Sequence, residues 1–266
     1  MNNEFSEHRE PDEIFLPLNE ERYSEFYSIE MNNFQKDIVF YKKHCAKGSS
    51  IIELGCGTGR VSRALASHCS LTTGLDLSLE MLNRAIINPA NKPYYVCMDM
   101  TQMAFRIDFD TILIPYNTLN LLKDEILIKR CLRQVLHLLK RNGALLLQLH
   151  IPDQELIEMN GKKRFQFQIF PLLHCKGKLI KETLRSFDNA AQTIRLEERY
   201  RVRPTDNSTT NEDFSHTLHL AGFSVKRWLY ILQLCGYQNL TLFGDYNSRP
   251  FNIKDDSILL IKACQS

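Results

Sequence analysis

Residues 51–60 read Ile-Ile-Glu-Leu-Gly-Cys-Gly-Thr-Gly-Arg, a short apolar run followed by three glycines at alternate positions. The apolar run is typical of a buried strand, and the glycines predict a sharp turn directly after it. Because glycine has no Cβ, such a turn lets a ligand approach the main chain closely. We therefore predict a strand that ends at a ligand-binding loop.

The spacing of Gly55, Gly57 and Gly59 separates this loop from two common phosphate-binding loops. The dinucleotide pattern G-x-G-x-x-G requires a third glycine where this chain has Arg60. The P-loop pattern G-x-x-x-x-G-K-[S/T] is also absent from the sequence. A phosphate cradle of either kind is therefore disfavoured.

Acidic residues end the next two apolar segments. Residues 61–68 have helical composition, and residues 71–75 form a second short strand that ends at Asp76. This interval is close to the spacing of about 20 residues expected for an acid that binds a ribose. Residues 94–98 form a third strand that ends at Asp99. A helix cap is the alternative for Asp76, and a turn is the alternative for Asp99.

Strands and helices continue to alternate along the rest of the chain. The expected strands are 110–115, 143–150, 238–243 and 257–263, and the expected helices are 124–139 and 223–235. This order predicts an α/β fold with a Rossmann-like, doubly wound, seven-stranded and mostly parallel sheet. Ligands bind such sheets at the carboxyl ends of the strands.

The glycine loop and the segments after it resemble the first motifs of class I S-adenosylmethionine-dependent methyltransferases, especially those that act on small molecules. The resemblance covers about residues 22–157 and 223–263, and it includes the D-x-S-x-x-M-L-like segment at 76–82 and the G-D-Y-x-x-x-P-F-like segment at 244–251. It implies S-adenosyl-L-methionine as methyl donor and S-adenosyl-L-homocysteine as product. The residues that it assigns to cofactor binding are Tyr23, Tyr27, Glu53, Gly55, Cys56, Gly57, Gly59, Arg60, Asp76, Leu77, Met81, Asp99, Met100 and Pro115.

The segment 115–122 is similar to the family pattern P-[F/Y]-N-x-x-x-x-L, which implies that acceptor and methyl donor meet there. Tyr116 and Asn117 are the residues we expect to orient the acceptor by hydrogen bonds. His150, at the end of the fifth strand, is the candidate general base, and an ordinary strand-end histidine is the alternative. Direct in-line displacement needs mainly correct positioning, so a base is not required for every acceptor.

We expect the chain to form a single methyltransferase domain, 1–266. Two of its segments lie outside the alternating strands and helices of the sheet and are expected to cover the site. Residues 1–45 are predicted to form a helical lid, in which Tyr23 and Tyr27 either contact the cofactor or pack in the core. Within 1–37, ten acids stand against three bases, which indicates a solvated start. Residues 160–222 are predicted to form an inserted antiparallel β substrate cap, because 165–170, 179–187 and 193–202 alternate at the strand period.

The predicted cap is rich in cations. Residues 162–203 contain eleven Lys or Arg and four Asp or Glu, which favours an anionic acceptor and makes Arg195, Arg199 and Arg201 its first candidate ligands. The alternative is that these charges line the solvated face of amphipathic strands. Residues 204–211 are polar and begin with proline, so we expect a mobile loop there.

The net charge and the cysteine and histidine spacing exclude several classes of function. The net charge of +2 over 266 residues gives no sign of nucleic-acid binding, and the sequence has neither a signal-peptide h-region nor an apolar run long enough to span a bilayer. The eight cysteines lack C-x-x-C spacing and the eight histidines lack H-E-x-x-H, so we expect reduced thiols, a cytoplasmic location and no metal site. The favoured function is methyl transfer to a nitrogen or oxygen of a small molecule. An RNA, DNA or protein methyltransferase and a non-catalytic S-adenosylmethionine-binding module are the alternatives.

Overall fold

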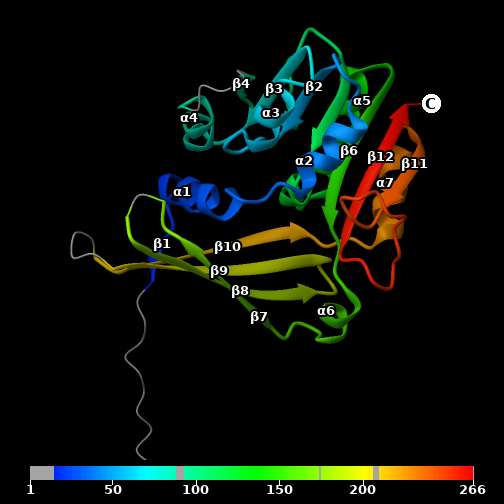
Figure 1. Ribbon diagram of the computed structural model, residues 1–266. Coiled ribbons are helices and arrows are strands. Elements are labelled where there is room, and N and C mark those ends of the chain that lie inside the picture. Colours follow the sequence, from blue (N-terminus) through cyan, green and yellow to red (C-terminus); the bar gives the residue numbers. More distant parts are fainter. Residues whose placement is uncertain (1–14, 88–92, 174, 206–209, 266) are drawn as a thin grey trace, which may run out of the picture.

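The computed structural model describes residues 15–87, 93–173, 175–205 and 210–265, which form a large and a small β-sheet (Figure 1). The large sheet has seven strands in the order β11-β12-β6-β5-β2-β3-β4, and only β12 runs antiparallel to its neighbours. Along the chain its strands are β2 (Ser50–Leu54), β3 (Leu71–Asp76), β4 (Tyr94–Cys97), β5 (Phe109–Ile114), β6 (Leu139–His150), β11 (Tyr237–Phe243) and β12 (Ile258–Gln265). The predicted Rossmann-like sheet is confirmed.

Helices cover both faces of the large sheet because its central strands are apolar on both sides. Ile51 and Ile52 are adjacent in β2 and therefore point to opposite faces. Ile51 packs in a cluster with α2 (Lys36–His44) and α3 (Arg60–Leu65). Ile52 packs in a second cluster with α5 (Glu125–Leu138) and α7 (Val225–Leu234). Both isoleucines are fully buried, so the doubly wound arrangement follows directly from this apolar run.

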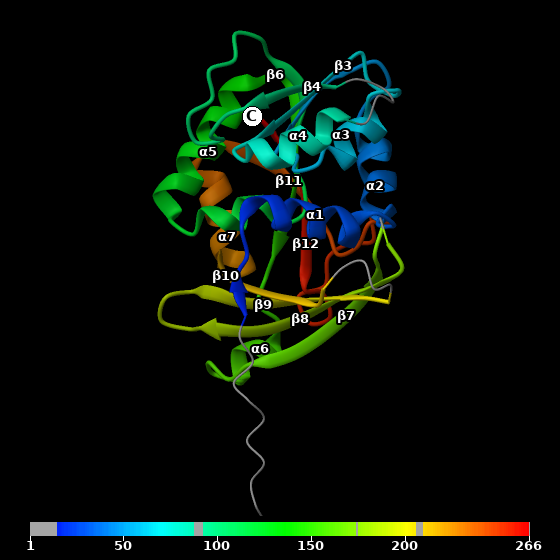
Figure 2. The same cartoon turned by 90° about the vertical axis from the view of Figure 1, so that its left-hand side faces the viewer.

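The small sheet lies beyond the carboxyl ends of the parallel strands (Figures 1 and 2). Its five strands are arranged in the order β1-β10-β9-β8-β7. They are β1 (Leu16–Pro17), β7 (Arg164–Pro171), β8 (Gly177–Asp188), β9 (Thr193–Pro204) and β10 (Glu212–Ala221). The predicted antiparallel insertion is present, but β10 and the short parallel β1 were not expected. Of the loop predicted at 204–211, residues 206–209 lie outside the described part of the chain.

Helix α1 (Glu20–Met31) lies between the two sheets (Figure 2). Asn19 caps its N-terminus by accepting a hydrogen bond from Arg22 N at 2.8 Å. Phe26 and Ile29 pack against the small sheet, in a cluster that includes Tyr200. Within the segment predicted as a lid, α1 therefore lies over the strand ends, whereas α2 packs on the face of the large sheet. The acidic start at residues 1–14 lies outside the described residues.

Short helical elements η1 (Thr118–Leu122), α4 (Leu79–Ile87) and α6 (Gln154–Glu158) follow β5, β3 and β6 respectively. None of the helices that the structure describes is long and apolar enough to cross a bilayer, and the cytoplasmic location stays a prediction. All eight cysteines lie within the described residues and are free thiols. No cluster of His, Cys, Asp and Glu side chains in this part of the chain is arranged to hold a metal ion.

Candidate active site

The glycine loop joins β2 to α3 at the carboxyl edge of the large sheet. Gly55, Gly57 and Gly59 have φ values of +67°, +53° and +73°, in the left-handed region that other residues rarely adopt. A Cβ at Gly55 would also overlap the Thr118 side chain. The loop is held to β3, because Cys56 N donates to the Leu75 carbonyl at 2.9 Å and the Cys56 side chain is buried. The glycines thus let the loop turn tightly and pack against the Thr118 and Tyr27 side chains.

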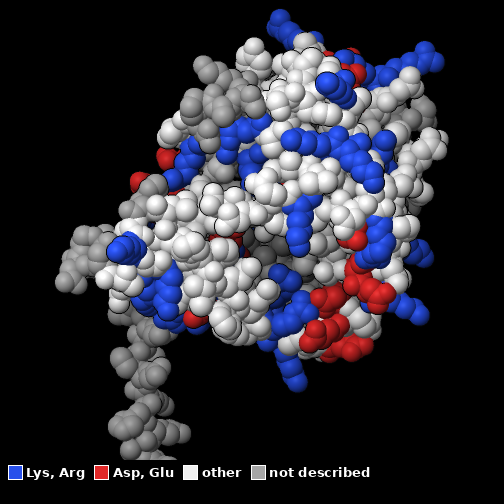
Figure 3. Space-filling view, in the orientation of Figure 1, with Lys and Arg blue, Asp and Glu red and all other residues white. Residues whose placement is uncertain are grey.

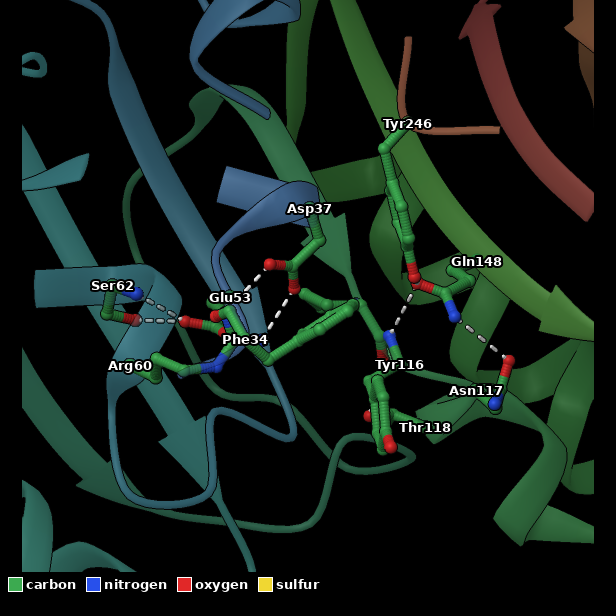
Figure 4. Close-up of polar contacts among 11 residues, drawn as sticks. Phe34, Asp37, Glu53, Arg60, Ser62, Tyr116, Asn117, Thr118, Gln148 and Tyr246 are labelled. Atoms are coloured by element: carbon green, nitrogen blue, oxygen red, sulfur yellow. Dashed lines mark hydrogen bonds and ion pairs between the residues drawn. The ribbon is translucent and has the colours of Figure 1, made fainter. Parts of the chain in front are cut away.

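Glu53, in the strand before this loop, binds the helix that follows the loop. Its carboxylate is buried and accepts hydrogen bonds from Ser62 N, at 2.8 Å, and from Ser62 Oγ (Figure 4). Burial raises the pKa of Glu53 to about 8, against the lowering effect of the Ser62 hydrogen bonds. The side chain therefore supports the loop from within the fold by binding the first turn of α3.

The raised pKa of Glu53 predicts a pH-dependent stability. Below its ordinary value of 4.5, the carboxyl is protonated in the folded and unfolded states, and its stabilising contribution is then lost as the pH rises through about 8. We expect the melting temperature to fall more between about pH 5 and pH 8 in the wild type than in Glu53→Gln. Thermal unfolding across this range measures the difference. Parallel curves for the two proteins would contradict the prediction.

The two strand-end acids lie where the sequence predicts them. Asp76 Oδ2 accepts from Gly57 N at 2.7 Å, and Oδ1 accepts from Ser78 N at 2.9 Å. Since a carboxylate can accept about four hydrogen bonds, each oxygen can still accept one from a ligand. Asp99 Oδ1 accepts from Thr101 N at 2.7 Å, and this bond is the main reason why the pKa of Asp99 is lowered. Both acids therefore stabilise local turns and also remain suited to bind hydroxyl or amino donors.

Three neighbouring residues from the predicted set take different environments. Leu77 is exposed, Met81 is buried in α4, and Met100 packs at the edge of the main core. An exposed apolar side chain next to Asp76 is well placed to contact an apolar part of a ligand, whereas Met81 contributes mainly to packing. The buried Pro115 ends β5, and its carbonyl accepts from Thr118 Oγ1 at 2.8 Å.

Arg60 joins α2 to the glycine loop. Its guanidinium lies 2.5 Å from Asp37 Oδ2 and donates to the Phe34 carbonyl at 2.8 Å (Figure 4). The Asp37 side chain is fully buried, so this ion pair is shielded from solvent. Arg60 therefore acts on the site by fixing the position of Phe34 and of the start of α2.

Aromatic rings lie around the space beside the loop. Tyr27 of α1 approaches Gly57, since its Cε1 would lie 3.3 Å from a Cβ at that position. Its ring is edge-on to Tyr116, with centroids 6.5 Å apart, and Phe34 contacts both Tyr116 and Tyr246 at 6.0 and 5.7 Å. The site is thus lined on this side by four aromatic residues, Tyr27, Phe34, Tyr116 and Tyr246. The other predicted tyrosine, Tyr23, packs against the small sheet, with its ring tilted to that of His216 at a centroid distance of 5.0 Å.

The loop after β5 carries a strained backbone. Tyr116 and Asn117 have φ values of +49° and +64°, which side-chain-bearing residues adopt at a cost of about 1–3 kcal/mol each. Gln148 holds this conformation: its Oε1 accepts from Tyr116 N at 3.3 Å and Tyr246 Oη at 3.0 Å, and its Nε2 donates to Asn117 Oδ1 at 3.4 Å (Figure 4). Strain of this kind concentrates at functional sites, which supports Tyr116 and Asn117 as acceptor-positioning residues.

His150 ends β6 with its imidazole almost completely buried. Its main chain is bound by Asn120, whose Nδ2 donates to the His150 carbonyl at 2.9 Å, but its Nε2 has no partner among the described residues. Burial, followed by the charge of Arg185, lowers the pKa of His150 to about 4. The imidazole is therefore neutral near pH 7, and its pKa is far below the value that suits a general base at that pH.

The predicted acceptor residues line one cavity of about 680 Å³. Its walls include Phe34, Lys36, Tyr116, Asn117, Gln148, His150, Arg185, Asp245 and Tyr246. Neither Gln148 nor Arg185 was predicted as a site residue, although the sequence around each of them is unusual. Gln148 is a polar residue within an apolar strand, and Arg185 shares the alternation of Leu179 and Phe187, which are buried.

The arginines expected to bind an anion lie elsewhere. In β9, Arg195, Arg199 and Arg201 alternate with Tyr200 and its neighbours, whose face packs on α1, so they lie on the opposite, outer face of the small sheet. Arg195 pairs with Glu197 at 3.2 Å, and Arg201 pairs with Glu182 at 2.9 Å. Arg195, which is 50% exposed, fits the alternative of a solvated strand face, whereas Arg201 is only 16% exposed.

Charged residues also occur on the inner face of the small sheet. Lys181 Nζ lies 2.7 Å from Glu30 of α1 and 2.8 Å from Glu198 of β9, and all three side chains are at most 12% exposed. His216 Nε2 lies 2.7 Å from Glu198, and Tyr200 Oη donates to Glu30 at 2.7 Å. Burial would raise the pKa of Glu198, but His216 and Lys181 lower it to about 2. This buried network joins α1 to the small sheet.

Comparisons with known proteins agree with this architecture. Residues 51–143 match a family described as a methyltransferase domain. A curated protein of Geobacillus sp. (strain WCH70), whose name describes it as a methyltransferase, is 32% identical over 138 residues, which make up 50% of this chain and 53% of that protein. The chain thus matches about half the length of this relative.

Solved structures match over almost the whole chain. An S-adenosylmethionine-dependent methyltransferase from Clostridium acetobutylicum has a TM-score of 0.75 at 17% identity and covers 92% of this chain and 98% of its own. The sugar N-methyltransferase KedS8 from Streptoalloteichus sp. has a TM-score of 0.71 at 16% identity and covers 96% and 97%. At such identities the likeness shows the fold. Residues 51–143 therefore form a methyltransferase domain, and the chain has the fold of S-adenosylmethionine-dependent methyltransferases.

Proposed function

We propose that this chain binds S-adenosyl-L-methionine at the glycine loop and transfers a methyl group to a nitrogen or oxygen of a small molecule held in the 680 Å³ cavity. The observation that carries the proposal is the continuity of the two sites. Gly57 of the loop lies against Tyr27, and Tyr27 contacts Tyr116, which lines the cavity. A donor at the loop and an acceptor in the cavity would therefore be neighbours.

The residues around the loop suit this donor. Gly55, Gly57 and Gly59 give the loop its left-handed backbone, Asp76 has acceptor positions for ribose hydroxyls, and Asp99 has a carboxylate oxygen for the adenine amino group. S-adenosyl-L-methionine supplies a methyl group that is already activated by its sulfonium centre, so positioning provides much of the rate. The chain would contribute that positioning through Asn117, Tyr116 and their common partner Gln148.

Several features favour a small acceptor over a macromolecule. The small sheet and α1 cover the strand ends where a large substrate would have to reach (Figure 1). On the face shown in Figure 3, Lys and Arg side chains are dispersed among uncharged ones, and acidic side chains gather at the lower right. The sugar N-methyltransferase among the structural neighbours supports a small-molecule amine as one acceptor class.

A product assay tests this function. The purified chain is incubated with S-adenosyl-L-methionine and a panel of small amines, phenols and carboxylic acids, and mass spectrometry detects acceptors that gain one methyl group. Labelling of RNA or protein without any small-molecule product would refute the small-molecule proposal. Binding of S-adenosyl-L-homocysteine without turnover of any acceptor would favour a non-catalytic binding module.

Asn117→Gly is the matched variant for this assay, because glycine keeps the left-handed backbone and removes only the amide side chain. We expect unchanged affinity for S-adenosyl-L-homocysteine and a turnover lowered by about tenfold to a hundredfold, since a misplaced acceptor reacts slowly. Calorimetry and initial rates measure the two quantities. Full turnover in the variant would remove Asn117 from the proposed acceptor site.

A further inference from the structure

Arg185 is a cation of the small sheet that lines the cavity. Arg185 lies in β8 and shares the inner face of the small sheet with Lys181 and Phe187. It has neither a hydrogen bond nor an ion pair among the residues that the structure describes, and its Nε is shielded from solvent. A partly buried guanidinium whose Nε is shielded and has no bound acid is unfavourable, so this position points to a missing anionic partner.

The acids nearest to Arg185 are already used. Both carboxylate oxygens of Asp153 bind Arg164, at 2.8 and 3.2 Å, and Oδ1 also caps α6 by accepting from Leu156 N at 2.8 Å. Glu198 is paired with Lys181 in the network described above. Burial and the charge of Arg164 accordingly lower the pKa of Arg185 from its ordinary value. Among the described residues, Arg185 therefore has no acid bound directly to it.

A second unpartnered group lies in the same cavity wall. His150 is buried and its Nε2 has no hydrogen bond within the described residues. In its neutral form with hydrogen on Nε2, the ring is a donor. A guanidinium and an imidazole N–H together match the oxygens of a carboxylate or a phosphate, and a guanidinium can bind two such oxygens at once.

We propose that Arg185 and Nε2 of His150 bind an oxyanion group, a carboxylate or a phosphate, of the methyl acceptor. The inference rests on the proposed methyl transfer and specifies its substrate class. The same cavity carries Asn117 and Tyr116, which would hold the nucleophile. The acceptor thus combines a nucleophilic nitrogen or oxygen with an anionic group that anchors it.

The test uses inorganic phosphate and acetate as separate probes of the two oxyanions. Each is titrated into the wild type, Arg185→Met and Arg195→Met, and binding is measured by calorimetry and by the melting temperature. Arg195→Met is the matched control, because the same substitution then falls on the outer face, where the side chain is 50% exposed. The probe that binds more tightly identifies the group.

We expect Arg185→Met to lose at least about tenfold in affinity for the preferred probe, whereas Arg195→Met binds like the wild type. Without the probe, Arg185→Met should melt above the wild type, because it removes a partly buried charge that has no bound acid. The probe should then raise the melting temperature of the wild type and not that of Arg185→Met. Equal binding by wild type and Arg185→Met, or binding of neither probe by the wild type, would overturn the proposal.

Titration with S-adenosyl-L-homocysteine separates this inference from the proposed function. Retained binding of S-adenosyl-L-homocysteine by Arg185→Met, together with loss of the probe, supports both. Arg185-dependent probe binding in a wild type that does not bind S-adenosyl-L-homocysteine would support the oxyanion site and refute the methyl-donor site.

Discussion

Replacing Asp76 with alanine is expected to lower the affinity for S-adenosyl-L-homocysteine by about tenfold to a hundredfold, because each hydrogen bond to a charged acceptor contributes about 1.5–3 kcal/mol. The carboxylate lies at the end of β3, and each of its oxygens keeps an acceptor position after binding Gly57 N or Ser78 N. Calorimetric titration of the wild type and the variant measures the loss.

Asp76 also holds the glycine loop, so a loss of affinity alone does not identify a ribose contact. A ligand lacking the 2′-hydroxyl group separates the two effects. If Asp76 binds that hydroxyl, the wild type should prefer S-adenosyl-L-homocysteine over the 2′-deoxy analogue, and Asp76→Ala should bind both about equally. The same preference in both proteins would assign Asp76 to the loop alone. The melting temperature of the free variant reports how far the loop itself is disturbed.

The fold and the geometry of the glycine-loop side of the candidate site could be predicted because they depend on local chemistry. Alternate glycines require left-handed backbone wherever they occur in a tight turn, and Gly55, Gly57 and Gly59 all adopt it. Acids at the ends of parallel strands necessarily meet at one sheet edge, as Asp76 and Asp99 do. These signals lie within a few residues of each other and need no knowledge of tertiary packing.

The acceptor side could not be predicted in the same way, because strand alternation does not say which face is covered. Arg195 is flanked by apolar residues and lies on the outer face, whereas Arg185 is in phase with Leu179 and Phe187 and lines the cavity. The strand β10 was missed for a related reason. Its inner positions include His216 beside Phe214 and Leu220, and this polar residue is explained only by Glu198 of the neighbouring strand.

The second large effect is expected at Lys181. Lys181→Met should lower the free energy of unfolding by about 3–5 kcal/mol, because it leaves the buried carboxylates of Glu30 and Glu198 without their shared cation. Lys163→Met is the matched control. Lys163 pairs with Glu197 at 2.8 Å, but its side chain is 47% exposed, so we expect a loss of only about 0–1 kcal/mol. Chemical denaturation of both variants measures the difference.

The pH dependence then distinguishes loss of the cation from loss of packing. In the wild type, the pKa of Glu198 is lowered to about 2, so its contribution is present above its ordinary value of 4.5 and is lost as the pH falls through about 2. Without Lys181, burial and mutual repulsion should instead raise the carboxylate pKa values, so the variant should gain stability on acidification from about pH 7 to pH 5. If the difference in unfolding free energy between the two proteins does not change with pH, lost packing accounts for the destabilisation. Adding Glu198→Gln to Lys181→Met should restore part of the stability, since one of the unpaired charges is then removed from between α1 and the small sheet.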